Sequence, residues 1–182
     1  MKASKARLVS VDGVDASAVI AAARRAIDRR GRGGVSHWDA SGIFQDLCVA
    51  DAAAGAPSAR TLLLLYAADL AFRLRWEIRP ALAEGRTVVA APYVETAVAF
   101  GRAAGLPAAW LRNLFRFAPR PTDRLFVSRS SGSPVGVDGF VGFVCERMLG
   151  GRKQRASRRI ADGATAHLRQ AAMRAKKSKK RS

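Results

Sequence analysis

The chain has 182 residues, 49% of them hydrophobic, which is enough for one domain with a sizeable core. Its net charge of +18 excludes an acidic protein and favours polyanionic partners; 12 of the 32 Lys and Arg residues and a single acid lie in residues 152–182. No run of about 18 apolar residues occurs and no hydrophobic signal core opens the chain, so we expect no membrane span and a cytoplasmic location.

Apolar residues recur with the periods of strands and helices, which alternate along the chain. The expected strands are residues 6–12, 34–38, 86–91, 123–128 and a short fifth strand at 158–163. The expected helices are residues 17–30, 41–53, 59–84, 93–104, 107–118, 140–150 and 164–175. We expect a kink at Pro80 in the third of these helices, and Trp76 and Trp110 in the core. The alternation predicts an α/β fold, a doubly wound parallel sheet of about five strands flanked by helices.

The C-terminal end is basic and poor in apolar residues. Residues 1–165 are expected to form the domain, and residues 166–182 a basic helix followed by a disordered tail. The disorder is expected at KKSKKRS, residues 176–182, which contain no apolar residue. Two interpretations of this end stay open: nonspecific, salt-dependent contact with nucleic acid, or a solvated tail that only keeps the protein soluble.

Residues 11–20, VDGVDASAVI, lie between an expected strand and an expected helix, which is the setting of a phosphate-binding P-loop. The P-loop pattern is G-x-x-x-x-G-K-[ST], and Gly13 fits its first position. Ala18, Val19 and Ile20 occupy the positions of the second glycine, the lysine and the magnesium-binding hydroxyl. Backbone N–H groups from Gly13 to Ala18 could still cradle a phosphate, but the lysine and the hydroxyl are absent.

Residues 62–106, LLLLYAADLAFRLRWEIRPALAEGRTVVAAPYVETAVAFGRAAGL, resemble the thymidylate kinase family. They match its long helix, the I-x-P-A-L-x-x-G end of that helix, its third strand and the region of its D-R-Y motif. VSVDGVD resembles the start of the family's P-loop, and HWDASG falls where the family carries an acidic-Pro-Gly-Gly loop. The resemblance extends over residues 7–163 and implies a P-loop NTPase-like fold that handles ATP, Mg²⁺ and dTMP.

Several positions that carry cations or metal ligands in the family are apolar in this chain. Besides Val19, Ala91 and Pro92 replace the Asp and Arg of D-R-Y, Leu70 aligns with the base-reading arginine, and Trp38 with the arginine of the second loop. Phosphoryl transfer depends on positioned positive charge, so these changes predict a catalytically inactive protein, and no catalytic residue is assigned.

The resemblance also implies a set of binding residues. On the substrate side, Asp15 takes the place of the acid that meets the sugar hydroxyl, Asp39 that of the second-loop acid and Tyr66 that of the base-stacking aromatic, while Tyr93 keeps the last letter of D-R-Y. Helix capping by Asp15 and ordinary packing of the two tyrosines stay open as alternatives.

The implied cofactor-binding residues are in the loop and in the family's lid. In the loop they are Gly13, Asp15 and Ser17, and in the lid Arg129 and Arg152. A lid arginine could stand in for the missing lysine, although Ile20 would leave the magnesium site unrepaired.

The sequence therefore favours a pseudoenzyme that binds a nucleotide or nucleoside. One alternative is an active dTMP kinase with a rearranged site, which would use ATP and Mg²⁺; another is a nucleic-acid-associated scaffold that uses the basic tail. The resemblance implies a homodimer formed through the long helices. His37 and His167 lack the spacing of a metal site, and none is expected.

Overall fold

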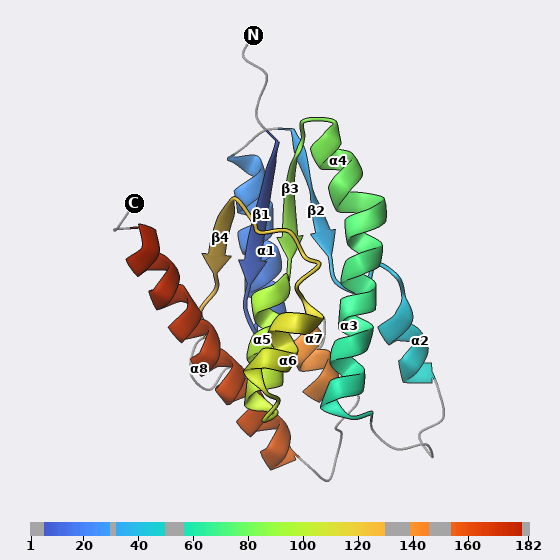
Figure 1. Ribbon diagram of the computed structural model, residues 1–182, viewed down its shortest axis with the longest axis vertical. Helices are drawn as coiled ribbons and strands as arrows, with labels where there is room; N and C mark the ends of the chain where they lie inside the picture. Colours follow the sequence, from blue (N-terminus) through green and yellow to red (C-terminus); the bar gives the residue numbers. More distant parts are fainter. Residues whose placement is uncertain (1–5, 30–31, 50–56, 130–138, 146–153, 180–182) are drawn as a thin grey trace.

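The computed structural model describes residues 6–29, 32–49, 57–129, 139–145 and 154–179. Within them, one layer of strands lies between helices (Figure 1). The strands are β1 (Arg7–Asp12), β2 (Gly33–His37), β3 (Thr87–Ala91) and β4 (Asp123–Phe126). Their order in the sheet is β2-β3-β1-β4, and all three pairings are parallel. The expected α/β fold with a parallel sheet is confirmed.

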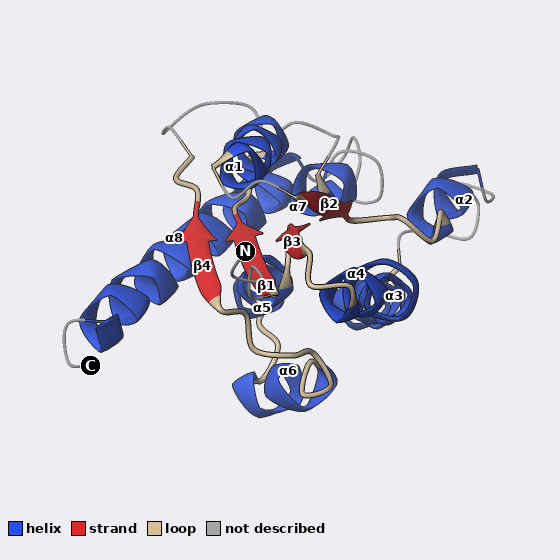
Figure 2. Cartoon of the chain, turned by 90° about the horizontal axis from the view of Figure 1, so that it is seen from above, coloured by secondary structure: helices blue, strands red, loops and turns tan. Residues whose placement is uncertain are grey.

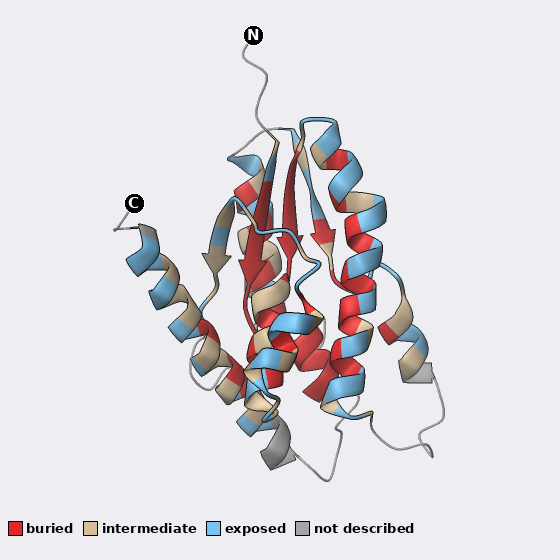
Figure 3. Cartoon of the chain, in the orientation of Figure 1, coloured by how far each residue is buried: buried red, intermediate tan, exposed pale blue. Residues whose placement is uncertain are grey.

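Helices cover both faces of the sheet (Figure 2). The helices and helical turns are α1 (Ala16–Asp28), α2 (Ile43–Val49), α3 (Ala59–Arg73), η2 (Leu74–Ile78), α4 (Arg79–Ala83), α5 (Val94–Ala103), α6 (Ala108–Leu114), α7 (Phe140–Phe143) and α8 (Gln154–Lys179). Val9 and Val11 of β1 pack toward α1, whereas Leu8 faces the core beneath α3 and α5, so alternate residues of the strand serve opposite layers. A parallel strand covered in this way is apolar on both faces, and β3 is buried over its whole length (Figure 3).

The expected long helix is one rod with a change of winding in the middle. The π-helical turn η2 joins α3 to α4 and ends just before Pro80, which lies in the first turn of α4. Proline lacks the N–H that would continue the α-helical ladder, and a wider turn accommodates this loss. Trp76, on this turn, is 61% exposed, so the expectation that it lies in the core is wrong.

The expected fifth strand is also wrong, because residues 158–163 belong to α8. Ala161, Ala164 and Leu168 are buried at helical spacing, in the core cluster that also contains residues of α5. The segment RRIADG has a single β-branched residue, and arginine and alanine are good helix formers, so helix propensity and packing agree. The described sheet therefore has four strands and ends at β4.

Helix α8 also extends into the end of the chain that was expected to be disordered. It runs through Lys179, so residues 176–179 are helical and only residues 180–182 lie outside the described part. Lysine is a good helix former, and the helix is already anchored on the core at Leu168. The helix crosses residues 165 and 166, where the sequence predicted a boundary.

Candidate functional site

The candidate site lies where β1 and β3 end, because the carboxyl ends of parallel strands meet at one edge of the sheet. Asp12 is the last residue of β1, and the loop that follows it leads into α1. Ala91 ends β3, and a cis Ala91–Pro92 peptide leads to Tyr93 at the start of α5.

Asp12 is the polar centre of this edge. Its Oδ1 accepts hydrogen bonds from the backbone N–H groups of Tyr93 at 3.0 Å and Thr96 at 2.9 Å, and from the Thr96 hydroxyl at 2.9 Å. The same hydroxyl accepts the N–H of Gly13 at 3.1 Å. The first residue after β1 is thereby tied to the first turn of α5, and the ends of the two strands are held together.

The environment of Asp12 favours its protonated form. Burial raises the pKa of its carboxyl to about 6; the nearby Glu95 carboxylate raises it too, and the hydrogen bonds from Thr96 and Tyr93 oppose the shift. Its second oxygen, Oδ2, is buried and has no hydrogen-bond partner among the described residues. Sequence reasoning missed Asp12, although a carboxylate that ends an otherwise apolar strand was a readable signal.

The loop expected to cradle phosphate is tightly packed. Asp15 caps α1, because its Oδ1 accepts the N–H of Ala18 at 3.0 Å. Helix capping was the alternative to sugar binding that the sequence left open for this residue. Val19 is 2% exposed, and a Cβ placed on Gly13 would lie 2.7 Å from its Cγ2. Ser17 is exposed on the first turn of the helix. The side chain at the lysine position therefore points into the apolar layer between α1 and the sheet.

Two carboxylates organise the loop between β2 and α2. Asp39 has a left-handed backbone with φ of 56°, and its carboxylate accepts the N–H groups of Phe44 at 2.8 Å and Gln45 at 3.1 Å in the first turn of α2. Asp69 of α3 accepts the N–H of Asp39 at 3.1 Å and both the N–H and the hydroxyl of Ser41. Burial raises the pKa of Asp39 above its ordinary value.

Arg73, one helical turn after Asp69, is fully buried and ties three elements together. Its Nε donates to the hydroxyl oxygen of Ser36 at 3.0 Å, and its Nη2 donates to the carbonyl groups of Ser36 at 2.8 Å and Pro92 at 3.1 Å. Its Nη1 lies 3.8 Å from Asp69 Oδ2. The Ser36 hydroxyl donates in turn to Glu77 at 2.6 Å. The sequence analysis also missed this buried group. The signal that could have revealed it is the oppositely charged pair Asp69 and Arg73, four residues apart in an otherwise apolar helix.

Aromatic side chains fill the space between α2, α3 and α7. Phe140 lies 4.6 Å from the ring of Tyr66 and 5.7 Å from that of Phe44, measured between ring centroids. Trp38 packs against Phe44 at 5.2 Å and Phe143 at 5.4 Å. Trp38 and Tyr66 thus contact other rings of the protein, and both are buried.

The hydroxyls of the two expected ligand-binding tyrosines are used inside the protein. Tyr66 donates to the carbonyl of Tyr93 at 2.8 Å, and Tyr93 donates to the carbonyl of Pro119 at 2.8 Å. Burial raises the pKa of both phenols above the ordinary value, so both remain protonated donors.

Arg129 lies just beyond β4, where its Nη1 pairs with Asp162 of α8 at 3.0 Å. It lines a cavity of about 890 Å³ between β4 and α8. The other expected site residues that the structure describes line neither this cavity nor the two smaller ones described beside β4 and α8. Arg152 lies outside the described residues. Within the described ranges, no cluster of His, Cys, Asp and Glu could hold a metal ion, and no helix is long and apolar enough to span a membrane.

Comparison with known proteins finds similarity to thymidylate kinases over part of the sequence. No protein-family model matches the chain. Over 58 residues it is 41% identical to a probable thymidylate kinase of Pyrococcus abyssi and 43% identical to one of Pyrococcus horikoshii. Each match covers 32% of this chain and only 28% of the relative.

The fold is similar over a longer stretch. The crystal structure of thymidylate kinase from Ehrlichia chaffeensis matches with a TM-score of 0.60 and 12% identity, covering 87% of this chain and 83% of that one. The chain is therefore thymidylate-kinase-like, in fold over most of its length and in sequence over about a third of it.

Proposed function

We propose that this protein is a thymidylate-kinase-like pseudoenzyme, which keeps the kinase fold but does not transfer phosphate. One observation carries the proposal: four positions that the family resemblance assigns to cations or metal-supporting groups hold buried apolar side chains. These are Val19, Trp38, Leu70 and Ala91, each at most 6% exposed.

The loss of positive charge at these positions accounts for the proposed inactivity. A transferring phosphoryl group is stabilised mainly by lysine, arginine and magnesium held around it. Removing one such donor costs roughly 3–4 kcal/mol of barrier, or a factor of about 10² to 10³ in rate. Packing makes the loss hard to reverse, because a cation brought to Val19 or Leu70 would have to displace core residues.

Binding of a nucleotide or nucleoside is the narrower part of the proposal. The candidate contacts are Gly13, Asp15 and Ser17 at the start of α1 for a phosphate, and Asp39, Tyr66 and Tyr93 for a nucleoside. Since Phe140 packs on Tyr66, base binding there requires α7 to move. The compartment that fits such a ligand is the cytoplasm, where nucleotides are made and used.

Two assays test these parts separately. Incubation with ATP, Mg²⁺ and dTMP should form no dTDP above background, with an active thymidylate kinase as positive control. Protein-dependent dTDP formation that disappears in Arg129→Ala would refute the pseudoenzyme. Calorimetry with thymidine, dTMP and ATP tests binding, and neither heat nor a stability shift at millimolar ligand would remove that part alone.

A second candidate function, association with nucleic acid, is supported by the surface of α8. Arg158, Arg159, Arg174, Lys176 and Lys177 are exposed along this helix, and Asp162 is the single acid of its sequence. A basic helix of this kind attracts phosphates through counterion release. We expect deletion of residues 175–182 to weaken RNA and DNA binding and to flatten its dependence on salt; unchanged affinity would reject this function.

A homodimer through the long helix is supported by its exposed apolar residues. Leu64, Phe72 and Trp76 are 54%, 40% and 61% exposed, and their spacings of eight and four residues place them on one side of the rod. An apolar stripe of this kind is typical of an interaction surface. Sedimentation should show a dimer.

A further inference from the structure

In the described sheet β4 is an edge strand, and its outer side has the shape of a binding site for an added strand. In the described part of the chain β4 pairs only with β1. The N–H of Val127 donates to the carbonyl of Asp12, and Asp12 is paired in register with Phe126, so the peptide groups of Leu125 and Val127 face β1. Alternate residues of a strand direct their peptide groups to opposite sides, and those of Arg124 and Phe126 therefore point outward.

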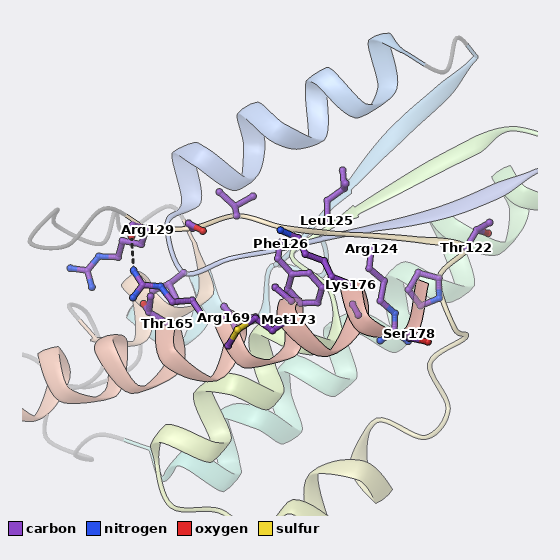
Figure 4. Close-up of a pocket in the computed structure, with 17 residues that line it drawn as sticks. Thr122, Arg124, Leu125, Phe126, Arg129, Thr165, Arg169, Met173, Lys176 and Ser178 are labelled. Carbon is purple, nitrogen blue, oxygen red and sulfur yellow. Dashed lines mark hydrogen bonds between the residues drawn. The ribbon is translucent and has the colours of Figure 1, made fainter. Parts of the chain in front are cut away.

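Helices border this edge on both faces. On one face, a cavity of about 890 Å³ separates β4 from α8 (Figure 4). On the other face, a cavity of about 630 Å³ separates β4 from α1. Leu125, Phe126, Val127 and Ser128 line both cavities. The edge thus projects between two helices, much as an inner strand of a parallel sheet lies between two helical layers.

The apolar residues of β4 are only half-buried, unlike those of β3. Leu125 and Val127 pack toward α1, and Phe126 packs toward the opposite layer. Met173 of α8 faces the larger cavity and is 58% exposed. Another strand laid beside β4 would cover these side chains on both faces.

The charge around the edge is of one sign. Arg169 and Lys176 of α8 line one cavity, and Arg25 and Arg29 of α1 line the other. No carboxylate is among the described lining residues of either cavity, and no described acid forms an ion pair with these four cations. Arg124 and Arg129, which also line the larger cavity, pair with Glu95 and Asp162.

We propose that the outer edge of β4 binds an acidic, extended peptide segment of a partner protein as an added strand. The backbone of the peptide would pair with the outward-facing peptide groups of β4, and its carboxylates would meet the cations of α8 and α1. A second copy of this chain is disfavoured at this edge, because its own β4 edge is bordered by the same four cations, Arg169, Lys176, Arg25 and Arg29. The inference does not depend on whether the protein transfers phosphate.

The test uses the intact protein and a fluorescent peptide, acetyl-EVEVEVEVE-amide, followed by fluorescence anisotropy. Two changes should each weaken binding about tenfold or more. One is N-methylation of alternate peptide residues, which keeps the charge and removes the ladder hydrogen bonds. The other is the double variant R169E/K176E, whose residues are exposed, so that folding should be unaffected. The matched control R158E/R159E changes the same charges on the same helix, and its affinity should stay within about twofold.

Hydrogen exchange gives a second readout, because the outward-facing amide of Phe126 should exchange more slowly when the peptide is bound. Equal binding of the N-methylated and unmodified peptides would overturn the proposal in favour of nonspecific charge attraction. Equal weakening by the two charge variants would also overturn it, as would unchanged exchange at Phe126. So would the absence of peptide binding under conditions in which a single-stranded oligonucleotide binds.

Discussion

Val19→Lys restores the residue that a P-loop carries at this position, and we expect it to destabilise the fold rather than to activate the protein. Val19 packs with Val9, Val11 and Ala23 in the layer between α1 and the sheet. The space toward the loop is occupied as well, because even a Cβ on Gly13 would lie 2.7 Å from Val19 Cγ2.

The magnitude follows from burial. An ammonium held in this layer would have to lose its proton, and at pH 7 this costs about 1.36 kcal/mol for each of the roughly 3.4 pH units below the ordinary lysine pKa of about 10.4. That is near 5 kcal/mol, and overpacking adds roughly 1–3 kcal/mol. The loss is comparable with the whole stability of a typical domain, about 5–15 kcal/mol, and corresponds to a fall in melting temperature of about 10 °C or more.

Thermal and urea unfolding measure the effect, with Ile20→Lys as the matched control. Ile20 is the next residue and only half-buried, so a lysine there can extend to water and should cost little. A melting temperature of Val19→Lys within about 2 °C of that of the parent protein would contradict this expectation, because the ammonium would then reach solvent or the phosphate site.

Three further predictions concern other parts of the structure. Asp12 has a pKa of about 6 in the folded protein and 3.8 as its ordinary value, so it stabilises the fold at low pH and this contribution is lost as the pH rises through 6. The unfolding free energy of the parent minus that of Asp12→Asn should therefore fall by about 2 kcal/mol between pH 4 and pH 7, and a constant difference would contradict the assigned environment. Arg73→Met leaves Asp69 buried without its cation and should cost about 3–5 kcal/mol in urea unfolding; a loss below about 1 kcal/mol would mean that the pair is not structural. Trp76→Glu should shift a dimer to monomers in sedimentation, whereas Phe117→Glu, exposed on another surface, should not; two unchanged profiles would exclude the α3 interface.

The sequence predicted the strands well where both local pattern and burial agree. Thr87–Ala91 is a continuous apolar run between a helix stop and a Pro, and it is a fully buried strand. RRIADG offered no such run, and its packing as helix depends on α5, which is distant in the sequence. Trp76 likewise lies on an apolar-looking helix, but which side of that helix faces the core is fixed by the tertiary fold.

The sequence predicted where the candidate site lies, but not the hydrogen bonds that connect its residues. The strand–loop–helix pattern around Gly13 located the edge of the sheet, and Asp15 was correctly recognised as a capping candidate. The joint role of Asp12 and Thr96 links residues 84 positions apart, so no local pattern contains it. The same holds for Arg73 with Ser36, 37 positions apart.

A single-turnover assay tests the absence of phosphoryl transfer most directly. The protein is held in molar excess over γ-labelled ATP, with Mg²⁺ and saturating dTMP, so that even one slow transfer per molecule is detected. We predict that the label stays on ATP, apart from hydrolysis equal to that in a protein-free control. Labelled dTDP that accumulates in proportion to the protein would contradict the account and would mean that other cations serve the site.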